Sequence, residues 1–136
     1  MSTPGLPPTP AAEAVVYGIP NCDTVKKARS WLAEHGVAYR FHDFKKQGVP
    51  ADRLASWIAA AGWDKVLNRQ GTTWRKLPAD EQAAVRDAAS AAALLQREAS
   101  AIKRPVVEWH SAGHTQVSVG FVPDQWQAWR DAAPKG

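Results

Sequence analysis

The stretch "AVVYGIPNCDTVKKAR" (residues 14–29) decides how we expect this chain to fold. Its first six residues are apolar and rich in β-branched side chains, which is typical of a central strand buried on both faces. After the turn at "PN", apolar residues recur at helical spacing, and Gly36 is suited to ending that helix. The stretch predicts a strand, a turn and a helix, with Cys22 at the helix start.

Residues 37–43, "VAYRFHD", alternate between apolar and polar side chains and predict a second strand. A strand, a helix and a strand in this order predict two parallel strands joined by a right-handed crossover. Residues 50–99 then contain three stretches of helical character, so we expect a helical insertion there.

The chain returns to strand patterns after the insertion. "PVVEW" (105–109) and "TQVSVGF" (115–121) flank the glycine-containing loop "HSAGH", which predicts an antiparallel hairpin, and Pro123 begins a last helix. The expected class is α/β: a thioredoxin-like fold with a helical insertion between its β-α-β and β-β-α halves. We expect a single domain over residues 13–132, preceded by a flexible proline-rich tail over residues 1–12.

Length and composition indicate an ordinary globular protein. The chain has 136 residues, of which 45% are hydrophobic and 22% charged, enough for one domain with a real core. No apolar stretch approaches the roughly 20 residues of a membrane span, and the N-terminus lacks the features of a signal peptide. We therefore expect a soluble, cytoplasmic protein without membrane contact. A single cysteine excludes an internal disulfide.

Positive charge gathers around that cysteine. The formal net charge is +4, and six of the basic residues lie between residues 21 and 46. This distribution favours an anionic small-molecule substrate, and so modest an excess, without a basic stripe interleaved with exposed aromatics, argues against direct nucleic-acid binding.

Cys22 is the strongest candidate for chemistry. The unpaired backbone N–H groups and the positive dipole end at a helix start favour a thiolate, and thiols so placed have lowered pKa values. The Thr24 hydroxyl is a further donor toward the sulfur, and the Asp23 carboxylate stabilises the start of the helix. The alternative interpretation is a buried structural cysteine, the commoner role of a lone cysteine.

Histidines offer two weaker alternatives. His110 and His114 lie in the expected hairpin loop without a second cysteine or clustered carboxylates, so we predict no metal site there. A nucleophilic pair of Cys22 with His42 stays open, although nothing in the sequence holds the two together.

Five segments in order carry a family resemblance: "YGIPNCDTVKKAR", "HDFKKQG", "LNRQGTTWRKL", "DAASAAAL" and "IKRPVV". From about residue 14 to about residue 130 the chain resembles the arsenate reductase-like ArsC/Spx family, specifically its YffB-type branch. The resemblance implies that Cys22 is the nucleophile, that Arg69 and Arg104 are the arginines of its site, and that Pro105 is a cis-proline. Guanidinium groups fit this role because they offer an anion a planar fork of donors.

Two departures narrow what the family implies. The arsenate reductases of the family have a third arginine near the end of the hairpin, whereas no cation occurs here between residues 115 and 125, which argues against arsenate turnover. The Spx-type regulators carry a Cys-x-x-Cys redox switch, whereas this chain has Val25 where the second cysteine of that motif would be.

The expectation that follows is a glutathione-dependent thiol-disulfide reductase using one activated cysteine. It needs no bound cofactor: glutathione is the co-substrate, a mixed disulfide is the substrate, and glutaredoxin is a candidate partner. A glutaredoxin-coupled arsenate reductase and a non-enzymatic, Spx-like binding module are the alternatives. Besides Cys22, Arg69 and Arg104, the expected substrate-binding residues are Asn21, Asp23, Thr24, Lys26, Arg75 and Pro105.

Overall fold

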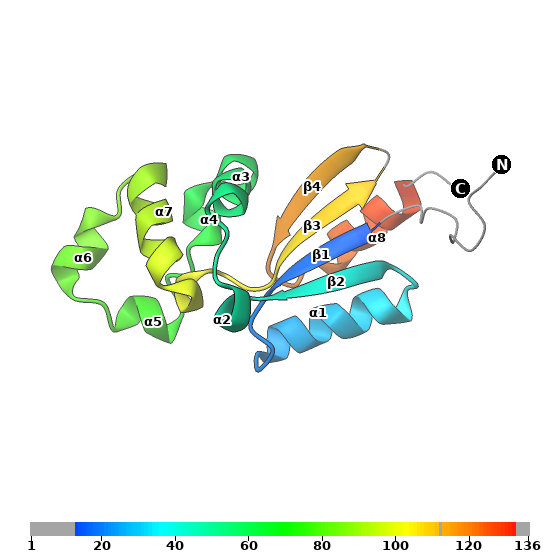
Figure 1. Ribbon diagram of the computed structural model, residues 1–136, viewed down its shortest axis with the longest axis horizontal. Coiled ribbons are helices and arrows are strands. Elements are labelled where there is room, and N and C mark those ends of the chain that lie inside the picture. Colours follow the sequence, from blue (N-terminus) through cyan, green and yellow to red (C-terminus); the bar gives the residue numbers. More distant parts are fainter. Residues whose placement is uncertain (1–12, 112, 133–136) are drawn as a thin grey trace.

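A four-stranded sheet organises the computed structural model, which describes residues 13–111 and 113–132. The strand order is β2-β1-β3-β4, with β1 parallel to β2 and antiparallel to β3, and β3 antiparallel to β4 (Figure 1). The strands are β1 (Glu13–Gly18), β2 (Ala38–Asp43), β3 (Val106–Ser111) and β4 (His114–Val119). The central strand β1 is buried on both faces, as its apolar run predicts.

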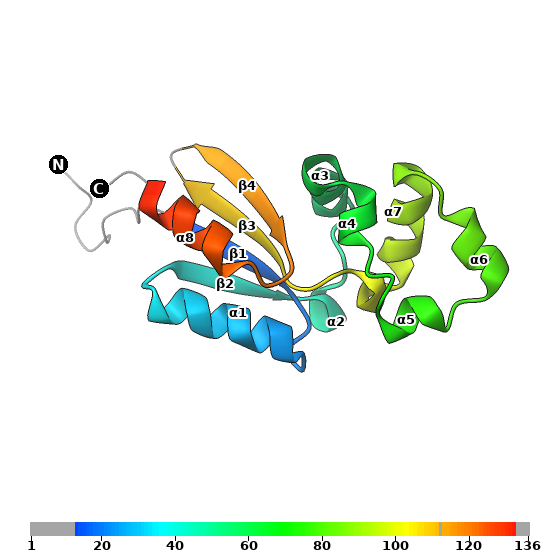
Figure 2. The same cartoon turned by 180° about the vertical axis from the view of Figure 1, so that it is seen from behind.

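Two helices cover one face of the sheet: α1 (Asp23–Glu34) and α8 (Pro123–Ala132) lie together in front of it in Figure 2. Val16 of β1 packs there with Leu32 of α1 and Trp126 of α8, all fully buried. Helix α1 ends where the chain turns through Gly36, whose φ of 70° is a conformation that favours glycine.

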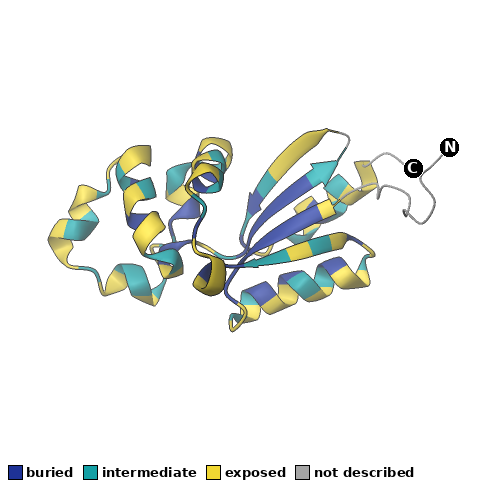
Figure 3. Cartoon of the chain, in the orientation of Figure 1, coloured by how far each residue is buried: buried dark blue, intermediate teal, exposed yellow. Residues whose placement is uncertain are grey.

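Helices also fill the chain between β2 and β3. They are α2 (Phe44–Gln47), α3 (Ala51–Ala61), α4 (Trp63–Val66), α5 (Thr72–Arg75), α6 (Ala79–Ala84), α7 (Ala88–Arg97) and a 3₁₀ turn, η1 (Ala99–Ala101). Helix α3 joins the core on the other face of the sheet, where its Trp57 packs against Tyr17 of β1 with ring centroids 4.6 Å apart. The helices α5 to α7 extend beyond the ends of the strands, and their outward faces are exposed (Figures 1 and 3).

Backbone pairing ties this helical segment to the start of β3. Leu67 and Ile102 form an isolated antiparallel bridge. On either side of it, Asn68 N–H donates to the Ala101 carbonyl and Lys103 N–H donates to the Val66 carbonyl, both at 2.8 Å. The chain that leads into β3 is therefore held by the segment that follows α4.

A buried carboxylate joins the sheet to α3. Glu108 of β3 is only 2% exposed and accepts hydrogen bonds from Tyr17 Oη (3.1 Å) and Trp57 Nε1 (2.8 Å). Arg53 Nε lies 3.5 Å from the same carboxylate, and His110 Nε2 lies 3.7 Å from it. Burial and the Glu108 charge raise the pKa of Tyr17, so its hydroxyl stays protonated and donates.

The predicted order of elements is confirmed, with three local differences. The hairpin is tighter than the five-residue loop we expected, because β3 runs to Ser111 and β4 starts at His114. The helices after β2 begin at Phe44, ahead of the predicted start at residue 50, and the short helices α2, α4 and α5 were not predicted. One-turn helices contain too few residues for a periodic pattern to be visible. The predicted tail, residues 1–12, lies outside the described residues.

Candidate active site

Cys22 lies at the N-terminal end of α1, as the sequence predicts. It is the N-cap residue, with extended backbone angles (φ −139°, ψ 122°), and its carbonyl accepts the first helical hydrogen bond from Lys26 N–H at 2.9 Å. The residue is half-buried.

A close approach between strand and helix positions this turn. A Cβ atom at Gly18, the last residue of β1, would lie 2.8 Å from Cγ2 of Val25 in the first turn of α1. Glycine therefore lets the first turn of the helix pack directly against the end of the strand. Any larger residue would push apart the two elements between which Cys22 is held.

Donors around the sulfur favour the thiolate. Burial raises the pKa of the Cys22 thiol, but the N–H of Val25, the Arg104 guanidinium and the N–H of Thr24 lower it by more, so that the pKa lies below its ordinary value. The contribution of Thr24 comes from its backbone N–H, whereas the sequence suggested its hydroxyl. The helix start and one arginine thus account for the activation of the thiol.

Arg104 is held in place to meet the cysteine. The Arg104–Pro105 peptide bond is cis, as the family resemblance implied. The Nη1 group of Arg104 donates to the Ser100 carbonyl at 2.9 Å, which fixes one side of the guanidinium. Its Nε is buried and has no hydrogen-bond partner among the described residues. A buried donor without a partner is unfavourable, so the arrangement of this guanidinium has a cost in stability.

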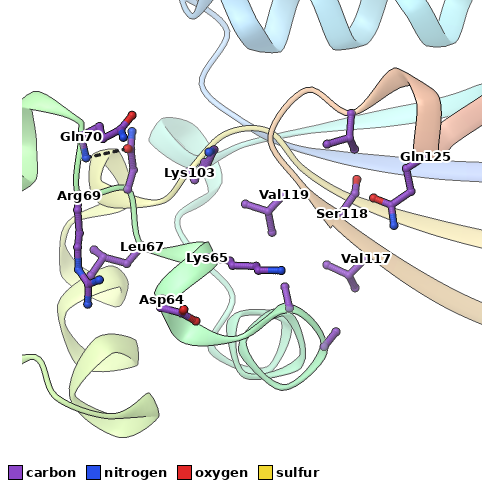
Figure 4. A pocket seen from close by; sticks show the side chains of 14 residues that line it. Asp64, Lys65, Leu67, Arg69, Gln70, Lys103, Val117, Ser118, Val119 and Gln125 are labelled. Carbon is purple, nitrogen blue, oxygen red and sulfur yellow. Dashed lines mark hydrogen bonds between the residues drawn. The ribbon is translucent and has the colours of Figure 1, made fainter.

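Arg69 has a different environment. Its guanidinium lies over the Trp63 ring, 5.2 Å from the centroid, and the side chain is exposed. In Figure 4 it lies beside Leu67 at the rim of a cavity of about 640 Å³ that neither Cys22 nor Arg104 lines. The structure thus brings Arg104 to the thiol and leaves Arg69 stacked on an aromatic ring, and a role for Arg69 toward substrate stays a prediction.

The other expected binding residues surround the cysteine or lie farther along the chain. Asn21 and Asp23 flank Cys22 and are exposed, and Pro105 is buried beside Arg104. The exposed Lys26, one helical turn after the cysteine, lines a shallow depression together with Trp31 and Phe121. Arg75 is exposed at the end of α5.

Phe121 is a residue that the sequence interpretation missed. It follows β4 in the region where the family's arsenate reductases have their third arginine, it is 37% exposed, and its ring packs edge-on against Trp126. The preceding residue, Gly120, donates its N–H to the Pro105 carbonyl at 2.8 Å, so Phe121 lies next to the cis-proline. The sequence shows that no cation occurs in this region, but it does not show that the Phe121 ring is exposed.

The histidine alternatives receive no support. His42 Nε2 is hydrogen-bonded to the Gly48 carbonyl at 2.9 Å, and its ring lies against Tyr17, so the contacts of this histidine are accounted for without Cys22. His110 and His114 lie in the strands rather than in a loop. Over residues 13–111 and 113–132, no group of three or more histidine, cysteine, aspartate and glutamate side chains is arranged to hold a metal.

This sheet order, with a cysteine at the start of the first helix and a cis-proline before the third strand, defines a protein of the thioredoxin-like class. More particularly, the chain belongs to the ArsC family, whose model matches residues 17–129. Among the helices that the structure describes, none is long and apolar enough to cross a membrane.

Known proteins place the chain near the YffB and Spx branches of this family. A solved YffB protein is 49% identical, covers 85% of this chain and 96% of its own, and superposes with a TM-score of 0.76. An arsenate reductase (ArsC) related protein from Brucella melitensis is 47% identical, covers 87% of this chain and 94% of its own, and superposes with a TM-score of 0.64.

Two relatives known from sequence extend the comparison. An uncharacterized protein from Haemophilus influenzae is 38% identical over 114 residues, which is 83% of this chain and 95% of the relative. The global transcriptional regulator Spx of Streptococcus pyogenes is 24% identical over 112 residues, or 80% and 78% of the two chains. The chain is thus similar both to a protein described as related to arsenate reductase and to a protein named as a transcriptional regulator.

Proposed function

We propose that this protein is a glutathione-dependent thiol-disulfide reductase that works with a single cysteine. The observation that carries the proposal is the environment of Cys22, a half-buried thiol whose pKa is lowered by the N-terminal end of α1 and by Arg104. A lowered pKa raises the thiolate fraction near neutral pH, and the thiolate is the nucleophile in disulfide exchange.

The reaction has two exchange steps. The Cys22 thiolate attacks the glutathione sulfur of a mixed disulfide, the S–S bond breaks, and the released thiolate of the substrate takes up a proton. A second glutathione thiolate then attacks the Cys22–glutathione disulfide, which returns the Cys22 thiolate and forms oxidised glutathione. The two electrons that reduce the substrate come from glutathione, and with one cysteine in the chain the intermediate must be resolved by an external thiol.

The residues around the thiol suit glutathione, which has two carboxylates. The Arg104 guanidinium acts directly on the sulfur and the residue is only partly buried, and we assign this cation a carboxylate or a carbonyl of the bound tripeptide. Lys26, exposed one turn along α1, and the backbone around Asn21 and Thr24 complete the proposed surface. Arg69 and Arg75 belong to it only if glutathione binding moves them toward Cys22.

The first experiment follows adduct formation directly. Reduced protein is exposed briefly to oxidised glutathione from about pH 5 to about pH 9 and examined by intact mass spectrometry, with Cys22→Ser as the control. We expect one glutathione adduct, formed quickly already near neutral pH and absent from the control. Modification that accelerates only above about pH 8.5 would contradict an activated thiol.

Turnover is measured with the mixed disulfide of glutathione and 2-mercaptoethanol, coupled to glutathione reductase and NADPH consumption. Loss of turnover in Cys22→Ser supports the proposal, and unchanged turnover in that variant refutes it. The two alternatives have their own readouts. Arsenite formation with glutathione and glutaredoxin would support arsenate reduction, and an adduct without any turnover would favour an Spx-like regulatory role.

A further inference from the structure

The outer edge of β4 is an unpaired strand edge. In the described sheet β4 pairs with β3 alone, and Gly120 N–H donates to the Pro105 carbonyl at 2.8 Å. Antiparallel ladders alternate, so with Ser118 opposite Val107 the backbone groups of Ser118 face β3, whereas those of Val117 and Val119 face outward. No hydrogen bond from the rest of the described chain reaches these outward groups.

The cavity of about 640 Å³ lies beside this edge. It is bounded by β4 on one side and by α3, α4 and the segment after α4 on the other. Figure 4 shows Val117 and Val119 pointing into it and the Lys65 side chain reaching across from α4 toward β4. Its size is within the range of sites that enclose small ligands or part of a peptide.

The charges that line the cavity are mostly positive. Lys65, Lys103 and Arg69 contribute to its lining, against a single carboxylate from Asp64. Among the described residues, none of these three cations forms an ion pair. An uncompensated positive groove attracts carboxylates and excludes basic partners.

We propose that the edge of β4 and this cavity form a docking site for an acidic, extended segment of a partner protein. The segment adds to the sheet as a further strand, pairing its backbone with Val117 and Val119 and placing carboxylates at Lys65 and Lys103. Alternating outward N–H and C=O groups match a peptide backbone, whereas a small anion would use only donors. The site is distinct from the thiol: Lys103 and Arg104 are consecutive, but only Lys103 lines the cavity.

A second copy of the chain is a poorer occupant. Its own β4, "HTQVSV" (114–119), has no carboxylate, so pairing edge to edge would leave the lysines unneutralised. An acidic partner segment satisfies the backbone and the charges together. No thiol chemistry is involved, so this proposal and the proposed reductase activity succeed or fail separately.

The test measures binding of a fluorescein-labelled peptide in which glutamate alternates with threonine, by fluorescence anisotropy. Two control peptides are used. The first carries lysine in place of glutamate, and the second keeps glutamate but has alternate backbone nitrogens methylated. Lys65→Glu combined with Lys103→Glu reverses the charge of the groove. Lys76→Glu is the matched control, because this exposed lysine directly after α5 lies outside the cavity. Val117→Pro removes an outward N–H, which an edge strand tolerates, and Val117→Thr keeps it.

We expect the acidic peptide to bind, the lysine peptide not to bind, and N-methylation to weaken binding roughly ten-fold or more, because at least two backbone hydrogen bonds are lost. The double lysine variant should bind about five-fold more weakly or worse, and Lys76→Glu like the parent. Equal affinity for the methylated peptide, or no binding at all, overturns the proposal. Displacement of the peptide by inorganic phosphate at the same concentration as the peptide also overturns the proposal. A dimer that is seen by sedimentation and is not dissociated by the peptide overturns it as well.

Discussion

Truncating the buried carboxylate should test how the helical segment is attached to the sheet. Glu108→Ala removes the acceptor of two buried donors, Tyr17 Oη and Trp57 Nε1, and the charge that faces Arg53. Each buried donor left without a partner costs about 1–3 kcal/mol. Breaking a buried charged cluster from one side costs about 3–5 kcal/mol. We therefore expect Glu108→Ala to lower the free energy of unfolding by about 3–5 kcal/mol, a large part of the stability of a small domain.

Two companion variants divide this cost. Glu108→Gln keeps one acceptor oxygen, so it should cost about 1–3 kcal/mol, clearly less than the alanine. Tyr17→Phe removes one donor and leaves the carboxylate with Trp57 and Arg53, which should cost about 1 kcal/mol. Because both changes act on one hydrogen bond, their effects should not add in the double variant.

The assay is urea unfolding followed by circular dichroism, with free energies from linear extrapolation. Glu81→Ala is the control, because the Glu81–Arg97 pair has a shorter distance, 2.9 Å, but both side chains are about half exposed. An exposed pair is worth about 0–1 kcal/mol. If Glu108→Ala lowers the free energy of unfolding by no more than Glu81→Ala does, burial does not strengthen the contribution of the Glu108 carboxylate to stability, and the prediction is refuted.

Four further predictions concern the thiol. Arg104→Ala should raise the pKa of Cys22, so the rate of alkylation by iodoacetamide should rise at higher pH than in the parent; an unchanged profile would exclude Arg104 as an activator. Arg69→Ala should leave the same profile unchanged, because that arginine lies over Trp63; a shift would show that it acts on the thiol. Because the folded-state pKa of Cys22 is lowered, the thiolate stabilises the fold fully above the unfolded-state pKa of about 8.5, and this stabilisation is lost as pH falls through the folded-state pKa. Cys22→Ser should therefore lower the free energy of unfolding in urea more at about pH 9.5 than at about pH 6. Gly18→Ala should cost about 1–3 kcal/mol and slow alkylation, because its Cβ would meet Val25 at 2.8 Å; a stable, fully reactive variant would mean that the turn relaxes freely.

Strong local patterns made the framework predictable. The apolar run before Pro20, the periodic face of α1 and the proline at the start of α8 each specify one element by local chemistry alone, and the structure confirms all three. The N-cap position of Cys22 followed from the same signals.

Contacts distant in sequence were beyond prediction. Nothing near Arg104 indicates that the Ser100 carbonyl holds one side of its guanidinium and leaves Nε unpartnered. Glu108 was overlooked because a carboxylate in a strand normally faces water, and its partners come from residues 51 and 91 positions away. Arg69 was grouped with Arg104 by resemblance, whereas its side chain lies over an aromatic ring.

The position of β1 at the centre of the sheet also orders events during synthesis. β1 pairs with β2, which follows it closely, and with β3, which begins only at Val106. At translation rates of about 5–20 residues per second, several seconds separate the emergence of Cys22 from that of Arg104. The nascent chain therefore carries Cys22 and the N-terminal end of α1, whose Val25 N–H lowers the thiol pKa, before it has Arg104. The thiol gains the second source of its activation, the Arg104 guanidinium, only when the chain that leads into β3 has emerged and β3 has closed the sheet.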